Sequence, residues 1–214
     1  MAKPTISAQE ALRLLQEGNS RFVTGTAERP HQEPERRIET SREGQHPIAG
    51  VISCSDSRVP PEILFDRGIG DIFVVRVGGN VACTCGIGSI EYAVEEVGIP
   101  LVVVMGHSQC GAVTAVANNQ EVPGSIAELA KKIAPAVEKT RRDHPGFTEK
   151  ELVEEAAHAN VWQTIEDLFR HSSIIRQAVK TASVDMVAAF YDISSGYVTW
   201  MGKHPGQIRL LAEE

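Results

Sequence analysis

Two short polar segments of this sequence carry side chains that could hold a metal ion. They are Cys54-Ser55-Asp56-Ser57-Arg58 and Gly106-His107-Ser108-Gln109-Cys110-Gly111. Two thiolates and one imidazole form a ligand set that zinc accepts, and three protein ligands with one open position are typical of a catalytic zinc site. Cys54, His107 and Cys110 are therefore candidate zinc ligands, although the bare pattern is equally compatible with buried, inert thiols.

Asp56 and Arg58 lie beside the first cysteine and indicate a second catalytic element. A guanidinium binds a carboxylate bidentately and keeps it ionised, and an ionised carboxylate accepts hydrogen bonds but cannot donate them. Asp56 would then accept the proton of a zinc-bound hydroxide and orient that hydroxide toward an electrophile. The alternative is a surface ion pair that only caps the turn.

The two polar segments can meet only if the strands that precede them are neighbours in one sheet. Four apolar runs lack the polar alternation of half-exposed strands and predict buried, parallel strands. These runs are Ile48–Ser53, Ile72–Val77, Leu101–Met105 and Met186–Ile193. Because ligands gather outside the carboxyl ends of parallel strands, we expect Cys54 and His107 to lie side by side.

Helical patterns alternate with these runs and predict an α/β fold, with a mostly parallel central sheet and flanking helices. The patterns cover Pro61–Phe65, Ile87–Val97, a start at Gly111, Ile126–Arg141 and a long interrupted stretch from Thr148 to about Thr181. The segment Tyr191–Trp200 predicts a tight turn into an antiparallel edge strand.

The N-terminal part of the chain is predicted to form a helix followed by an arm. Ser7 begins a capping pattern for a helix that extends to Gly18, and the polar residues 24–45 are expected to run over the surface or over a partner. No repeat or linker divides the chain. We therefore treat 1–214 as a single domain, with an N-terminal helix and arm (1–45) and an α/β core (46–214).

Composition places the 214-residue chain among globular proteins and argues against two kinds of partner. Apolar residues make up 42% and charged residues 23%, and the net charge of −7 opposes binding to phosphate backbones and anionic membranes. The longest apolar run, Ile99–Met105, is far shorter than the roughly 20 residues of a membrane-spanning helix. We expect no nucleic-acid partner and no membrane association.

The first residues, Met1–Ser7, show no signal-peptide pattern, so we predict a cytoplasmic location, where thiols stay reduced. The four cysteines are then metal-binding, reactive or structural. In a strand, Cys83 and Cys85 would point to opposite faces, so at most one of them could close a structural zinc site. We interpret both as packing thiols, and redox chemistry through the pair is the weaker alternative.

At these residues the sequence resembles the β-class carbonic anhydrases. Four blocks carry the resemblance, in order and at family-like spacing: Cys54–Pro60, Phe73–Asn80, Gly88–Val94 and Gly106–Gly111. The resemblance implies one zinc ion per chain, bound by Cys54, His107 and Cys110, with water or hydroxide as the fourth ligand. It also implies that Asp56 and Arg58 form the orienting dyad.

The activity implied by this resemblance is that of a carbonate dehydratase, a zinc lyase. Zinc-bound hydroxide would attack carbon dioxide, and bicarbonate and a proton would leave. Two thiolates neutralise the charge of the metal and acidify bound water less than three neutral histidines do. We therefore expect hydration activity to rise toward alkaline pH.

The resemblance further implies a substrate pocket at a dimer interface, with self-association as a dimer or tetramer. The side chains of Gln45, Phe73 and Tyr92 would line this pocket, with the two aromatic walls able to come from the neighbouring subunit. The backbone N–H of Gly111, at a helix N-terminus, would face the developing bicarbonate anion. Without the resemblance, Phe73 and Tyr92 would be interpreted as core residues and Gln45 as a loop residue.

The sequence departs from the family pattern at two places. Val51 occupies the position of a tryptophan that a second, inhibitory bicarbonate pocket needs, so we predict no such pocket although Arg76 is present. Gly78 and Gly79 replace a larger side chain on the pocket wall, which predicts either a roomier pocket or a more mobile backbone.

Two rival functions follow from the same residues. One is a hydrolase of carbonyl sulfide or carbon disulfide on the same scaffold, because the same hydroxide could attack these molecules. The other is a non-catalytic, zinc-stabilised protein in which Asp56 moves from Arg58 to the metal and closes the site. An accessible water on the zinc would exclude the second.

Overall fold

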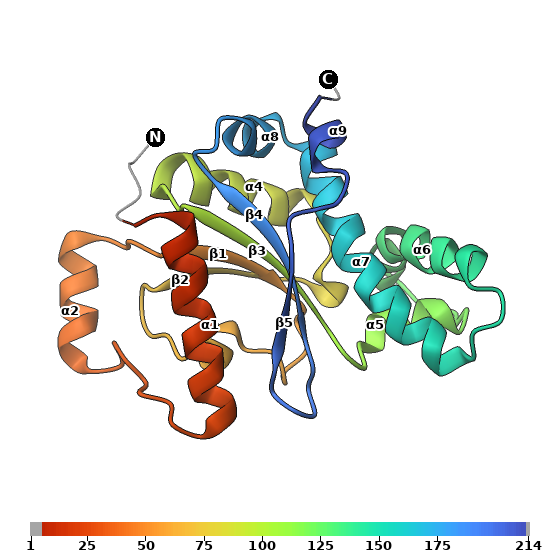
Figure 1. Ribbon diagram of the computed structural model, residues 1–214, viewed down its shortest axis with the longest axis horizontal. Coiled ribbons are helices and arrows are strands. Elements are labelled where there is room, and N and C mark those ends of the chain that lie inside the picture. The colour runs from red at the N-terminus through yellow and green to blue at the C-terminus, as the bar shows by residue number, and fades with distance from the viewer. Residues whose placement is uncertain (1–5, 213–214) are drawn as a thin grey trace.

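The computed structural model describes residues 6–212, and in this part of the chain a five-stranded sheet lies between layers of helices (Figure 1). The strands are β1 (Ala49–Ser53), β2 (Ile72–Arg76), β3 (Leu101–His107), β4 (Asp185–Tyr191) and β5 (Val198–Gly202). Their order is β2-β1-β3-β4-β5, with parallel pairing except between β4 and β5. The predicted α/β class and the antiparallel edge strand are both confirmed.

Nine α-helices are present in residues 6–212. They are α1 (Ala8–Thr24), α2 (Pro34–Glu43), α3 (Pro61–Leu64), α4 (Thr84–Tyr92), α5 (Gly111–Ala117), α6 (Ile126–Asp143), α7 (Glu149–His171), α8 (Ser173–Lys180) and α9 (Gln207–Ala212). A short 3-10 turn, Gly78–Asn80, follows β2, and a π-helical turn, Ala93–Val97, extends α4.

The strands bury both faces because successive side chains point to opposite sides of the sheet. In β3, Val102 and Val104 join the core under α4, α7 and α8, whereas Leu101 and Val103 join the core under α1 and α3. Figure 1 shows α1 crossing one face of the sheet, with α4, α7 and α8 on the other. The apolar runs that form β1, β3 and β4 are therefore buried almost throughout. The prediction of a buried strand is wrong for β2, which lies at the edge of the sheet, is mostly half-buried and ends with exposed Arg76.

The first helix is longer than predicted, because Gly18 does not end it. A Cβ atom at Gly18 would lie 1.8 Å from the carbonyl oxygen of Phe65, so this glycine permits α1 to pack closely against the segment after α3. The helix ends instead at Gly25, whose φ of 72° is the left-handed conformation common at helix C-termini. Ser7 accepts a hydrogen bond from the Glu10 amide, as its predicted capping role requires.

The polar segment 24–45 contains a helix that the sequence analysis did not predict. Helix α2 begins at Pro34, a residue favoured in the first helical turn, but it buries no residue. Ile38 is its only aliphatic side chain, so the helix has no apolar stripe for a sequence pattern to reveal. Helix α9 was missed as well.

Other boundaries differ by a few residues. Strand β3 continues to His107, beyond the predicted end at Met105, because its pairing with β4 extends to Tyr191. The predicted helix from Thr148 divides into α7 and α8 at Ser172, which caps α8 by accepting from the Ile175 amide.

No helix within residues 6–212 is long and apolar enough to cross a membrane. Most of the N-terminal stretch on which the signal-peptide prediction rests, residues 1–5, lies outside the described residues.

Candidate metal centre

The side chains of Cys54, His107 and Cys110 converge at the carboxyl ends of β1 and β3. One potential ligand atom from each residue lies within 4.8 Å of the other two. The residues come together because β1 pairs directly with β3, and Ser53, which precedes Cys54, lies opposite Met105. All three residues are buried, with exposed fractions of 5% for Cys54, 0% for His107 and 2% for Cys110.

The hydrogen bonding of His107 suits metal binding through Nε2. Its Nδ1 lies 2.9 Å from the carbonyl oxygen of Ser108, which can only accept, so the proton belongs on Nδ1. Nε2 is buried and has no hydrogen-bond partner among the described residues. A backbone carbonyl that orients the ring while the other nitrogen stays free is the usual support of a metal-binding histidine.

The pKa values of the two thiols are shifted in opposite directions. A hydrogen bond from the Cys110 thiol is the main cause that lowers the pKa of Cys54 to about 4, with further help from the backbone amides of Asp56 and Gly79. The same contact, together with burial, raises the pKa of Cys110 far above its usual value. The pair therefore holds one negative charge readily, and a cation between the sulfurs would stabilise the second.

These donors fit zinc. Two sulfurs and one imidazole nitrogen are present in a buried cluster, and neither the carboxylate of Asp56 nor any other histidine, cysteine, aspartate or glutamate of residues 6–212 joins it as a fourth donor. A set of three protein donors is typical of zinc sites that leave a position for solvent or substrate.

Asp56 and Arg58 form a bidentate ion pair beside the cluster. The Nε of Arg58 donates to Oδ1 of Asp56 at 2.9 Å, its Nη2 donates to Oδ2 at 2.7 Å, and its backbone amide also donates to Oδ1. This pairing holds the pKa of Asp56 well below its usual range, so the carboxylate is ionised and accepts hydrogen bonds only. The same Nη2 lies 3.4 Å from the Gln109 carbonyl oxygen, which links the dyad to the His107–Cys110 segment.

Arg76, at the end of β2, supports the same loop in a way the sequence analysis missed. Its Nε donates to the carbonyl oxygen of Cys54 at 3.1 Å, and its Nη2 donates to that of Asp56. The guanidinium thus fixes the backbone that carries both a candidate ligand and the dyad. The sequence shows a basic residue at the end of a strand. It does not show the partners of that residue, because they are backbone carbonyl groups, which every residue has.

The four predicted substrate-binding residues fall into two groups. Gly111 begins α5 directly after Cys110, and no atom lies within 4 Å of the point where its Cβ would be. Gln45 precedes β1 and therefore lies at the opposite end of that strand from Cys54. Phe73 pairs with Gly50 in the sheet and contacts Tyr92, with 6.3 Å between ring centroids.

A single chain therefore does not complete the predicted pocket. A five-residue strand spans about 17 Å, which separates Gln45 from the metal ligands at the other end of β1. Gln45 is exposed, and Tyr92 is 52% exposed.

Two further expectations need correction. Cys85 is not a packing thiol, because it lies in the first turn of α4 and is exposed to solvent, and Cys83 at the N-cap of α4 is only partly buried. Neither residue lies in a strand, and neither joins the metal cluster. Gly78 and Gly79 do not enlarge the pocket, because Leu129 and Ile133 of α6 fill the space beside them. A Cβ would lie 2.9 Å from a Leu129 methyl group at Gly78 and 2.6 Å from an Ile133 methyl group at Gly79.

Comparison with known proteins shows which family has this combination of fold and donor cluster. Residues 49–198 match the family profile described as carbonic anhydrase. Carbonic anhydrase 2 of Mycobacterium tuberculosis is 38% identical over 197 residues, covering 90% of this chain and 92% of the relative.

Solved structures agree at the level of the fold. A β-carbonic anhydrase of the fungus Aspergillus fumigatus superimposes with a TM-score of 0.75 at 24% identity, covering 95% of this chain and 97% of the other. One of two tetrameric β-carbonic anhydrases of Sordaria macrospora superimposes with a TM-score of 0.69 at 25% identity, covering 90% and 98%.

Together with these relatives, the mostly parallel sheet and the cysteine-histidine-cysteine cluster at its carboxyl end identify an α/β enzyme of the lyase class. The chain belongs to the β-carbonic anhydrase family. The family resemblance and the enzyme class, carbonate dehydratase, are confirmed.

Proposed function

We propose that this chain catalyses the zinc-dependent, reversible hydration of carbon dioxide to bicarbonate and a proton. The observation that carries the proposal is the buried convergence of Cys54, His107 and Cys110, with Nε2 of His107 unpaired, in a chain of this family. A zinc ion held by these three residues would acidify a bound water and so supply a strong nucleophile, increasingly as the pH rises.

In this proposal, Asp56 and Arg58 orient the nucleophile. Because both oxygens of the Asp56 carboxylate accept from Arg58, the carboxylate stays ionised and fixed in direction. Asp56 can accept one hydrogen bond more from water but cannot donate one, so it selects a single orientation of the attacking oxygen. The same pairing argues against Asp56 as a fourth metal ligand, since it would have to leave Arg58.

The first residue of α5 would receive the developing anion. The amide of Gly111 lies at a helix N-terminus, next to the Cys110 ligand, and the space at the Cβ position of this glycine is open. Free amides at such a position stabilise negative charge on a substrate oxygen.

The remaining substrate contacts would come from a second copy of the chain. Gln45, Phe73 and Tyr92 are remote from the metal ligands within one chain, yet exposed Tyr92 and helix α2, which buries nothing, offer surfaces for self-association. The solved relatives described as tetrameric support an assembly of dimer or larger.

Two expectations complete the proposal. A cytoplasmic location suits a centre made of two reduced thiols, and all four cysteines are free in the structure. We also retain the single-domain organisation, in which residues 46–214 form the core and 1–45 carry the helix and arm.

Side-by-side rates separate this function from its rival. The zinc-loaded chain is supplied with carbon dioxide, carbonyl sulfide or carbon disulfide in turn, and the rate for each gas is measured at several pH values. The proposal expects carbon dioxide hydration to be the fastest reaction by several orders of magnitude. Faster hydrolysis of either sulfur compound would replace the proposed substrate with that one.

A further inference from the structure

The thiol of Cys54 receives a hydrogen bond from a part of the chain that supplies no metal ligand. The backbone amide of Gly79 donates to its Sγ at 3.2 Å. Gly79 lies in the 3-10 turn Gly78–Asn80 after β2 and has a φ of 68°, a conformation that strains any residue with a side chain. The amide is buried with the turn, and this donor must stay in place for the contact to persist.

Helix α7 holds this turn from behind. The Nδ2 of Asn160 donates to the carbonyl oxygen of Gly79 at 2.7 Å. The hydroxyl of Thr164, one helical turn further on, shares its single proton between the carbonyl oxygen of Asn80 at 3.1 Å and that of Asn160 at 2.9 Å. Both side chains are buried, Asn160 with 1% and Thr164 with 2% exposed. One face of α7 therefore fixes two consecutive peptide groups of the turn.

Burial of the Asn160 side chain lowers the stability of the fold. Its Oδ1 is buried without a hydrogen-bond partner among the described residues, and a buried polar atom of this kind lowers stability. An apolar side chain of the same shape would fill the site without this cost. The amide nevertheless fixes the peptide on one side of Gly79, and the N–H on the other side points at Cys54.

We propose that Asn160 is a positioning residue for the metal centre: by holding the Gly79 carbonyl, it aims the Gly79 amide at the sulfur of Cys54. The proposal rests on the proposed function, because it concerns Cys54 as a zinc ligand. Under this proposal, a residue of α7 that lies 81 positions after Gly79 in the sequence influences how Cys54 binds the metal.

The chemical effect of this amide is to moderate one of the two thiolates. A hydrogen bond to a thiolate draws electron density from sulfur, so the sulfur donates less charge to a bound metal. Two thiolates already neutralise the charge of a divalent ion, and an N–H donor restores part of its electrophilic character. Asn160 would thus help a thiolate-rich centre to activate water.

The test replaces Asn160 and reads the metal centre directly. In Asn160→Leu the donor to Gly79 is lost while the size of the side chain is kept. Cobalt(II) is substituted for zinc, and the thiolate-to-cobalt charge-transfer band is recorded. We expect the band of Asn160→Leu to shift to longer wavelength, because a thiolate without its N–H donor gives up an electron more easily. We also expect zinc affinity, measured by competition with a chelator, to fall about tenfold, because the loosened turn no longer holds the Cys54 sulfur in its ligating position.

Thr140→Val is the matched control. Thr140 is 3% exposed and donates to the carbonyl oxygen of Ala136 in α6, so it loses a buried hydrogen bond that does not touch the turn. Its cobalt spectrum and zinc affinity should equal those of the parent. A shift of the same size in Thr140→Val would show a general packing effect and overturn the proposal.

The remaining outcomes are also decisive. An unchanged band and zinc affinity in folded Asn160→Leu would overturn the role of Asn160 and leave the proposed function intact. A parent chain without a thiolate-to-cobalt band would overturn the zinc centre itself, and this inference with it.

If Asn160→Leu does not fold, cadmium-substituted parent protein gives the answer. Scalar coupling in NMR spectra between a spin-½ cadmium isotope and the Gly79 amide proton is then compared between the parent and Thr164→Val. The proposal expects coupling in the parent that weakens in Thr164→Val, and absence of coupling in the parent would overturn it.

Discussion

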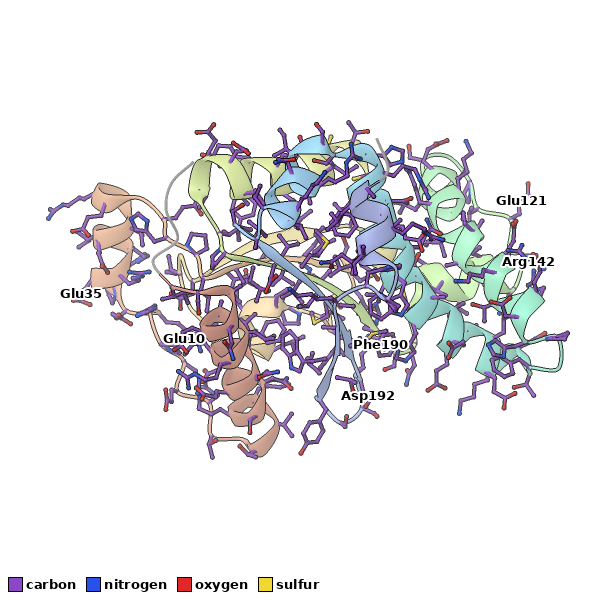
Figure 2. All side chains as sticks on the ribbon, turned by 45° about the horizontal axis from the view of Figure 1, so that its top comes forward. Glu10, Glu35, Glu121, Arg142, Phe190 and Asp192 are labelled. Atoms are coloured by element: carbon purple, nitrogen blue, oxygen red, sulfur yellow. The ribbon has the colours of Figure 1, made fainter. Side chains whose placement is uncertain are left out.

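The two ends of the sheet differ in how completely one chain builds them. At the carboxyl end, the three donor residues are buried and Asp56, Arg58 and Arg76 are joined by hydrogen bonds. At the amino end, Gln45 is exposed, Tyr92 is half exposed, and α2 buries none of its residues. In Figure 2, Glu35 on α2 lies at the outer edge of the molecule, remote from Phe190 and Asp192 at the carboxyl end of β4.

This difference separates two requirements of the proposed reaction. A metal ion needs several donors held within a few ångströms, and loops that follow neighbouring strands provide this inside one chain. A pocket for a small, neutral substrate needs walls around the metal that exclude water, and the chain keeps its predicted walls at the far end of β1. The comparison therefore predicts that each chain binds its metal ion alone, whereas catalysis needs residues from two chains.

The largest effect is expected from the metal end. Cys54→Ala or His107→Ala should lose most zinc and nearly all carbon dioxide hydration, because two donors hold the ion far less tightly than three. Zinc content by atomic absorption and hydration rates measure this. The exposed thiol provides the control, since Cys85→Ser should keep zinc and rate. Loss of zinc in Cys85→Ser, but not in Cys54→Ala, would reverse the assignment.

A smaller effect is expected when the dyad changes and the ligands remain. Asp56→Asn should keep one zinc ion per chain, while turnover falls about a hundredfold because the attacking oxygen loses its orientation. Asp185→Asn is the matched control at the amino end of β4, where the carboxylate pairs with Lys203 at 2.5 Å. Parental turnover in Asp56→Asn would contradict the orienting role.

Mixing of two defective variants tests the shared pocket. Gln45→Ala should reduce turnover up to about tenfold, the effect of one lost hydrogen bond to the substrate, with zinc retained. When Gln45→Ala and Cys54→Ala are refolded together, a mixed dimer contains one site with intact Cys54 from one chain and intact Gln45 from the other. Hydration per Gln45→Ala chain should therefore rise. A rate equal to the sum of the two separate preparations would mean that each chain builds its own pocket.

The smallest effect concerns stability and pH. The pKa of Asp56 is lowered in the folded protein, so its stabilising contribution is complete above the unfolded value of about 3.9 and is lost as pH falls through the folded value. The Tm of metal-free parent should exceed that of Asp56→Asn by at most a few degrees at neutral pH, because Arg58 is largely exposed. The difference should vanish in acid. A difference that grows as pH falls would contradict the ion pair as its cause.

Local patterns predicted most of the strands and the cluster of donors. The runs that became β1, β3 and β4 are largely apolar because both of their faces are covered, and Cys54 follows such a run directly. The rule that parallel strands present their carboxyl ends together then sufficed to bring His107 to Cys54.

Contacts between distant backbone groups could not be predicted in this way. The partners of Arg76 and Asn160 are carbonyl oxygens, which every residue has, so the sequence does not mark them. Gly18 was taken for the end of a helix because its close approach to Phe65 is a tertiary contact. The position beside Gly79 was interpreted as open pocket space because the side chain that occupies it, Ile133, lies on α6, far from Gly79 in the sequence.

The most direct test of the zinc-centred account is one titration. Zinc content and carbon dioxide hydration are measured on the same purified chain from about pH 6 to pH 9. The account predicts one zinc ion per chain throughout and a hydration rate that rises toward alkaline pH. A chain that binds no zinc, or one that holds zinc without hydrating carbon dioxide at any pH in this range, would contradict it.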